Sequence, residues 1–211
     1  SELGLGGITP SHGLIKKVAN ELDIPLYVLI RPRSGDFTYT ETEFDVMLQD
    51  IHFAKEIGVK GVVSGVLLPD NTIDVEQTGR LLKASEGLDF TFHRAFDWTP
   101  DPIQALHTLH ALGVKRVLSS GQSTSAMKGL ELLKKLKNIS DDLIIMPGGG
   151  IDSDNMLRFK EAGFKEIHGS ASRFREGLKG TIPMFSTVTL ENDQLTFSDR
   201  KTIELLRESI Q

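Results

Sequence analysis

The sequence of 211 residues contains no cysteine. This absence excludes disulfide bonds, thiol nucleophiles and thiolate metal ligands together. The net charge of −5 is spread along the chain without a basic block, so neither nucleic acid nor a membrane surface is an expected partner. No apolar stretch is long enough to span a membrane, and no charged-then-apolar leader opens the chain. We therefore expect a cytoplasmic protein, since a chain without cysteine fits a reducing compartment.

Six short apolar runs recur along the sequence, and turn residues bound each of them. This is the pattern of buried parallel strands. The runs are residues 25–31, 61–68, 89–94, 115–121, 142–150 and 165–171. Helical patterns lie between them, and three are well marked, at residues 41–58, 101–113 and 152–163. Pro102 suits a first helical position, Asp152 suits an N-cap, and Gly113 and Gly163 suit the position after a helix end.

Three joints between a helix and the next strand are nearly copies of one another: EIGVKGVV, ALGVKRVL and EAGFKEIH. In each, a glycine ends the helix, one apolar residue follows, and a lysine starts the strand. Self-similarity at this spacing is typical of a serial βα repeat. We expect an α/β fold, a (β/α)8 TIM barrel with about six βα units visible and its first two strands absent from this sequence.

The whole of residues 1–211 is expected to form one barrel domain. Its core units span residues 8–172, and a C-terminal hairpin around residues 191–194 and a last helix from about Asp199 occupy residues 180–211. An open doubly wound sheet is the alternative arrangement of six βα units.

Polar residues gather at the C-terminal ends of the predicted strands, which is the functional end of such barrels. They are Arg31, Arg33, Asp36, Ser64, Asp70, His93, Arg94, Asp97, Ser119, Ser120, Gln122, Gly148 to Gly150, His168, Ser170 and Ser172. Lys60, Lys115 and Lys165 lie instead at strand starts, which argues against a Schiff-base aldolase. Alternation along the third run places Phe90 and Phe92 outward and turns His93 toward the barrel mouth.

These residues suggest an acid–base group and an anion site. His93 titrates near neutral pH when unperturbed and suits a general acid or base, with Asp97 to orient or charge it and Arg94 beside it. The glycines Gly148, Gly149 and Gly150, followed by Ser170, resemble a phosphate-binding loop, because glycines allow backbone N–H groups to approach an anion. Arg31, Arg33 and Arg94 would supplement that site. Two simpler interpretations stay open. His93 could be a structural histidine, and Gly148 to Gly150 could serve the backbone conformation alone.

A metal site is a further interpretation of these residues. His93, Asp97 and His168 would be its ligands if the fold brought them together. Copper(I) prefers sulfur, and Met146 is the methionine nearest a strand end.

Six motifs, GGITPS, IRPRSGDF, TFHRAFD, RVLSSGQ, PGGGI and HGSAS, occur in order up to about Ser172. Together they resemble the CutC copper-homeostasis family. The resemblance implies a cytoplasmic, oligomeric (β/α)8 barrel with copper as its ligand. It also implies that two strands precede GGITPS, and that the cysteines proposed to bind copper lie near those strands.

Two functions follow from these observations. The resemblance implies a copper-binding homeostasis protein, and we take copper homeostasis as the expected role. The residues themselves indicate an anion-binding pocket, which makes a barrel enzyme, isomerase- or lyase-like, acting on a small phosphorylated or anionic substrate the alternative. Whether the chain is an enzyme stays open at this level, as does a scaffold role for the expected homo-oligomer.

Overall fold

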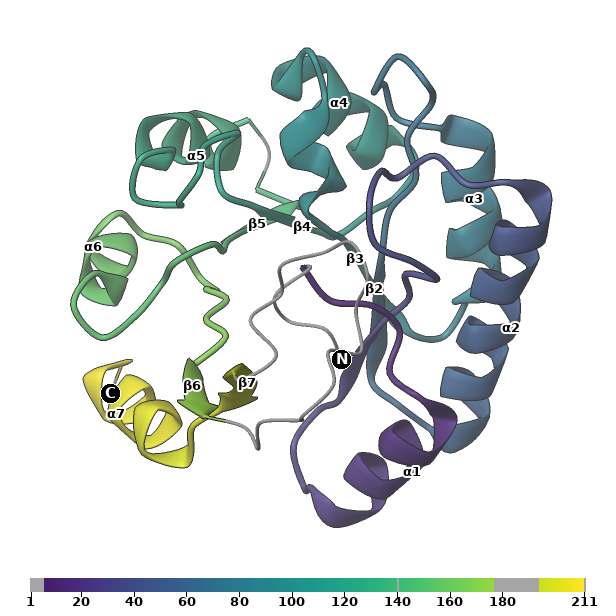
Figure 1. Ribbon diagram of the computed structural model, residues 1–211. Coiled ribbons are helices and arrows are strands. Elements are labelled where there is room, and N and C mark those ends of the chain that lie inside the picture. Colours follow the sequence, from purple (N-terminus) through teal and green to yellow (C-terminus); the bar gives the residue numbers. More distant parts are fainter. Residues whose placement is uncertain (1–5, 140, 177–193, 211) are drawn as a thin grey trace.

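A computed structural model describes residues 6–139, 141–176 and 194–210 of the chain. Its main sheet has five strands, β1 (Tyr27–Leu29), β2 (Gly61–Ser64), β3 (Asp89–Phe92), β4 (Arg116–Ser119) and β5 (Ile144–Pro147). The strands lie in sequence order and every neighbouring pair is parallel. The sheet curves around a central axis (Figure 1), as the βα repeat predicts. The fold is therefore α/β, built from the units of a (β/α)8 barrel.

Helices alternate with the strands and form the outer layer (Figure 1). They are α1 (His12–Glu21), α2 (Glu41–Ile57), α3 (Val75–Ala84), α4 (Pro102–Ala111), α5 (Leu130–Lys137) and α6 (Met156–Glu161), with a short 3-10 helix, η2 (Arg94–Trp98), after β3. Helix α2 shows why they pack there, because Phe44, Met47 and Ile51 repeat at helical spacing and are fully buried. None of the described helices combines the length and the apolarity needed to cross a membrane.

The three copied joints form the same C-terminal helix cap. Gly58, Gly113 and Gly163 have φ angles of 78°, 87° and 76°, in the left-handed region that glycine adopts without strain. Each glycine N–H bonds to a carbonyl three residues earlier, and the N–H of the next, buried residue bonds to a carbonyl five residues earlier. This is the Schellman arrangement. The sequence repeat therefore encodes a repeated way of ending a helix and entering a strand.

Two expectations about the last repeat unit are corrected. The predicted strand over residues 165–171 is reduced to one parallel bridge between Gly148 and His168. The N–H of His168 still donates to the carbonyl of Pro147, so the segment lies beside β5. Helix α6 begins at Met156, with Asn155 as its N-cap; Asp152 instead accepts hydrogen bonds from the N–H groups of Asp154 and Asn155, in a turn before the helix.

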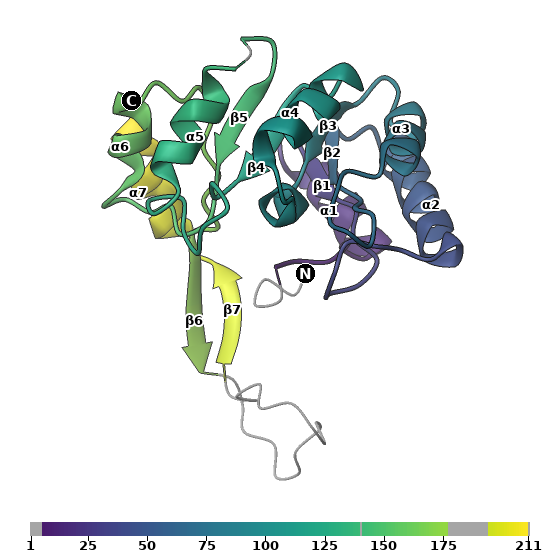
Figure 2. The same ribbon diagram turned by 90° about the horizontal axis from the view of Figure 1, so that it is seen from above.

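The C-terminal part forms an antiparallel hairpin and a helix. Strands β6 (Ser172–Glu176) and β7 (Gln194–Ser198) pair with each other, and α7 (Arg200–Ile210) follows. The hairpin thus begins at residue 172 and not 180, and residues 191–193 of its predicted turn lie outside the described residues. Figure 2 shows β6 and β7 extending away from the barrel body, on the side where the N-terminal segment lies.

A polar cluster fills the inner face of the sheet near the strand starts. The guanidinium of Arg116 makes two hydrogen bonds to Glu166, of 2.6 and 2.9 Å, and lies 5.3 Å from the ring centre of Tyr27. It also donates to the Thr91 hydroxyl, and the Tyr27 hydroxyl donates to Asp89 over 2.6 Å. Side chains from β1 and β4 meet only across the concave face, since two strands separate them. Thr91 therefore faces the interior, as the alternation predicts.

Candidate functional site

His93 follows β3 directly and lies at the C-terminal end of the sheet. Its N–H donates to the carbonyl of Ser64 in the neighbouring strand. Its imidazole Nδ1 accepts the N–H of Ala95 over 3.2 Å, so the side chain caps the start of η2. Gly65 makes room for the ring, because a Cβ at that position would stand 2.7 Å from Nδ1. In the sequence, only the glycine at position 65, directly after Ser64 of β2, indicates that another side chain packs at this point.

The surroundings of His93 make it a neutral imidazole. Burial, and then the positive charge of Arg31, lower its pKa from 6.5 to about 3. Because Nδ1 accepts a hydrogen bond, the neutral ring carries its proton on Nε2. Nε2 is buried and has no hydrogen-bond partner among the described residues. The prediction of a group that titrates near neutral pH is therefore wrong, since it assumed a more solvated ring.

Asp97 is also placed differently from the prediction. Its side chain is 7% exposed, and its carboxylate accepts hydrogen bonds from groups on the β3 and β4 exits. The donors are the Ser119 hydroxyl (2.6 Å), the N–H groups of Ser120 (3.0 and 3.1 Å) and Gln122 (3.2 Å), and Nε of Arg94 (2.8 Å). No hydrogen bond joins it to His93 in the described part of the chain. Asp97 therefore anchors the loop after β4 and orients Arg94, and it does not orient the imidazole.

Arg94 is held along one side and open along the other. Besides the bond from Nε to Asp97, its Nη2 donates to the hydroxyl of Ser120 over 2.7 Å. Its Nη1 lies beside Gly149, where an added Cβ would stand 3.4 Å from it. The Arg94 side chain is 43% exposed, so solvent reaches the guanidinium. The structure thus brings Arg94 to the glycine loop, as the sequence suggested.

Arg31 and Arg33 serve other contacts. Arg31 is buried, and its guanidinium donates to the carbonyls of Gly7 and Gly35. Arg33 bonds to Glu43 over 2.6 Å and to Asp36 over 3.0 Å, in the segment that leads into α2. The positive charge of Arg31 acts on His93, whereas the contacts of Arg33 hold it at the start of α2, away from His93 and the glycine loop.

The glycine loop joins β5 to α6 and lies against the His168 segment. Gly149 and Gly150 have φ angles of 112° and 71°, which side-chain-bearing residues rarely adopt. An added Cβ on Gly148 would stand 3.4 Å from Cδ2 of His168. Desolvation by the surrounding chain, and then the Arg94 guanidinium, lower the pKa of the His168 imidazole. Arg94, Gly148 to Gly150 and His168 therefore form one cluster, which we call the rim cluster.

Ser170 lies near this cluster in sequence but bonds elsewhere. Its hydroxyl is 2.9 Å from the hydroxyl of Ser172, and its carbonyl accepts from Ser198, so it ties the hairpin to the barrel. The predicted metal set is not assembled either. Within the described ranges, no three His, Asp or Glu side chains converge as metal ligands. The side chains of His93, Asp97 and His168 thus lie in three separate environments.

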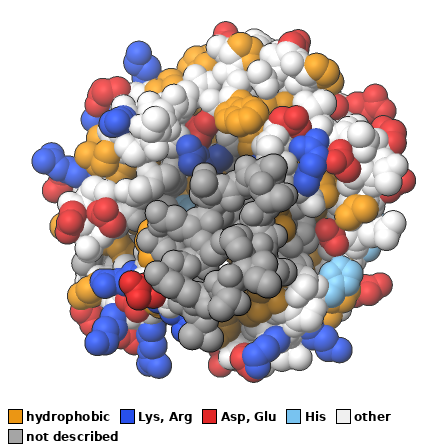
Figure 3. Space-filling model, viewed as in Figure 1, with side chains coloured by type: hydrophobic (Ala, Val, Ile, Leu, Met, Phe, Trp, Pro, Cys, Tyr) orange, Lys and Arg blue, Asp and Glu red, His pale blue; other side chains and the backbone are white. Residues whose placement is uncertain are grey.

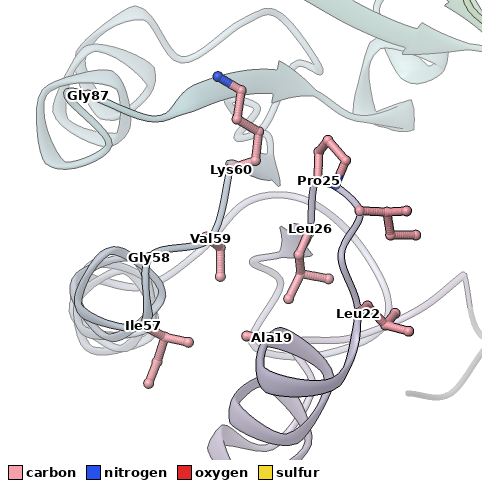
Figure 4. Close-up of a pocket in the computed structure, with 10 residues that line it drawn as sticks. Ala19, Leu22, Pro25, Leu26, Ile57, Gly58, Val59, Lys60 and Gly87 are labelled. Atoms are coloured by element: carbon pink, nitrogen blue, oxygen red, sulfur yellow. The ribbon is translucent and has the colours of Figure 1, made fainter.

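Two cavities lined by described residues lie at the opposite end of the sheet. One cavity of about 310 Å³ is formed where α1 ends and β2 begins, with Leu22, Ile24, Leu26 and Val59 among its lining residues (Figure 4). A second, of about 240 Å³, lies beside the start of β4. On the face seen in Figure 3, acidic, basic and hydrophobic side chains are mixed around the outer edge. Both cavities are on the end that stabilises a βα fold and not on the rim.

The fold and the rim cluster define a β/α-barrel protein whose strand exits carry arginine, histidine and a glycine loop. Comparison with known proteins makes this more specific. The CutC family model matches residues 1–173. A CutC family protein of Klebsiella pneumoniae (strain 342) is 45% identical over 169 residues, which cover 80% of this chain and 68% of that protein. The Pasteurella multocida (strain Pm70) relative is 40% identical and covers 99% of this chain and 87% of its own length.

A solved structure agrees with these sequence matches. The CutC protein from Streptococcus agalactiae, described as a copper homeostasis protein, is similar with a TM-score of 0.76 and 36% identity, covering 80% of this chain and 85% of that one. The chain belongs to the CutC family.

Proposed function

We propose that this chain takes part in copper homeostasis. The observation that supports the proposal is the family match over residues 1–173, together with the copper-homeostasis description of the Streptococcus agalactiae relative. The test is copper tolerance in a bacterium that lacks its own CutC protein. Expression of this chain should raise the copper concentration at which growth halves. If the chain is abundant and folded but copper tolerance stays unchanged, the proposal is wrong.

The described residues do not fit a copper site. Copper(I) favours thiolate and thioether ligands, and the sequence has no cysteine. Met146 lies in β5, but no three His, Asp or Glu side chains converge near it or elsewhere in the described ranges. The positive charge of Arg31 acts on His93, and that of Arg94 acts on His168, so each imidazole has a cation beside it. A neighbouring cation opposes metal binding at both rings.

The proposed role in copper homeostasis does not require the rim cluster to bind a copper ion. Titration of the purified chain with Cu(I), in competition with a chromophoric chelator, tests this part. We expect the chain to retain no stoichiometric Cu(I) at the rim cluster. The variants His168→Asn and Met146→Leu should therefore retain the same amount of Cu(I) as the wild type. Retention of one Cu(I) per chain that either variant abolishes, while His107→Asn on the exposed face of α4 does not, would contradict it.

The enzyme alternative has weaker support. It relied on an acid–base pair of His93 and Asp97, and the two side chains have different partners. A neutral, deeply buried imidazole supplies a hydrogen-bond donor at Nε2 and not a base poised near neutral pH. The comparisons likewise give no reason to prefer this alternative.

A further inference from the structure

We propose that the rim cluster binds a phosphate group, either free or as a monoester, between the guanidinium of Arg94 and the loop of Gly149 and Gly150. This goes beyond the proposed role in copper homeostasis, and it needs no metal. The argument rests on three features of the cluster: an oriented guanidinium, unpaired backbone donors and a neighbouring imidazole.

The guanidinium is oriented before any ligand arrives. Asp97 holds Nε over 2.8 Å and Ser120 holds Nη2 over 2.7 Å, so the plane of the group is fixed. Among the described residues Nη1 has no hydrogen-bond partner. The carboxylate of Asp97 also accepts bonds from several donors of the β4 exit, which offset its negative charge. A guanidinium fixed on one side presents its remaining N–H groups to an oxyanion at little cost in side-chain entropy.

The glycine loop presents donors beside that group. The carbonyl of Gly149 accepts the N–H of Ala126 over 2.9 Å, and the carbonyl of Gly150 accepts from the Asn155 side chain over 2.8 Å. These bonds fix the loop through its carbonyls, while the N–H groups of Gly149 and Gly150 have no partner in the described part of the chain. An added Cβ on Gly149 would stand 3.3 Å from Cβ of Ser120 and 3.4 Å from Nη1 of Arg94. Glycine therefore keeps open the space beside Nη1, and successive backbone N–H groups suit an anion.

The imidazole of His168 completes the cluster. The bridge to Gly148 places it beside the loop. The residue as a whole is exposed to solvent, while the neighbouring chain desolvates its ring in part. The positive charge of Arg94 disfavours protonation of His168. A bound phosphate would offset that charge. A neutral imidazole donates one hydrogen bond, and a protonated one adds a charge. A phosphate group, with two negative charges and several acceptor oxygens, matches this set better than a monovalent anion.

Isothermal titration of the full chain with inorganic phosphate and with glycerol phosphate tests the proposal. Sodium chloride at equal ionic strength is the reference salt. We expect saturable one-site binding of at least one of the two phosphates, and tighter binding of glycerol phosphate would identify an ester as the ligand. Arg94→Lys keeps a positive charge beside Asp97 but removes the planar donors, and it should weaken binding at least tenfold. His168→Asn should weaken it by a smaller factor.

Arg33→Lys is the matched control, because Arg33 is also held by carboxylates but lies outside the rim cluster. It should leave the affinity unchanged. If phosphate produces no more heat than chloride, or if the Arg33 and Arg94 variants lose affinity equally, the proposal is wrong. Should the Arg94 variant not fold, the imidazole proton signal of His168 in the wild-type chain replaces it. A shift on adding phosphate but not chloride supports the site, and the absence of a shift overturns it.

Discussion

The burial of His93 predicts a measurable loss of stability in mild acid. Its pKa is lowered from 6.5 to about 3 in the folded chain. A histidine with a lowered folded pKa contributes its stability above the unfolded pKa and loses it as the pH falls toward the folded value. Between pH 7 and pH 5 the unfolded chain takes up about three quarters of a proton at this residue, and the folded chain takes up almost none. The linkage relation gives a loss of about 2 kcal/mol over these two pH units.

The assay is urea unfolding of the wild type and of His93→Gln at both pH values. Glutamine retains an acceptor for the N–H of Ala95 but cannot titrate. The free energy of unfolding should therefore fall by about 2 kcal/mol more in the wild type, or about 4–8 °C in Tm, than in the variant. His107→Gln, an exposed change on α4, should behave as the wild type does.

Equal losses in the wild type and in His93→Gln would refute the reasoning. The same holds if the imidazole of His93 in the folded wild type titrates near pH 6.5 by NMR, a measurement that needs no variant. Either result would mean that the ring is solvated.

The remaining predictions concern packing and helix capping. Gly61→Ala should destabilise the chain by about 1–3 kcal/mol in urea unfolding, because its Cβ would stand 2.5 Å from the Tyr27 ring and 2.6 Å from a backbone oxygen. Gly79→Ala in α3, with no heavy atom within 4 Å of the new Cβ, should instead stabilise it by about 0.5–1 kcal/mol; a matching loss at both sites would contradict the steric argument. Thr40→Ala removes one half of the reciprocal capping box with Glu43 and should cost about 1 kcal/mol, and an unchanged unfolding midpoint would show that the cap adds nothing.

The rim shows which parts of a site can be inferred without a structure. Placing Arg94, Gly149 and His168 at strand exits required only the repeat and the rule that parallel strands end at one face. Their mutual contact was suggested because all parallel strands end at one face of a barrel, although β4 lies between β3, which precedes Arg94, and β5, which precedes Gly149. The choice of partner for Asp97 was not accessible in this way. Asp97 and His93 are four residues apart in sequence, yet η2 turns the carboxylate toward the β4 loop. The phosphate site, the homo-oligomer and the cytoplasmic location stay predictions.

The sequence by itself determined the repeating units of this protein. Gly58, Gly113 and Gly163 end their helices through local backbone conformation, which depends only on residues a few positions away. The same holds for the α2 capping box and for the alternation that turns Thr91 inward. Only the tertiary structure decided how polar groups pair and how far they are desolvated. The contact of Arg116 with Tyr27 and Glu166, and the pKa of His93, arise from segments distant in sequence. Their physical cause is burial and charge summed over the whole fold, and no local pattern carries that information.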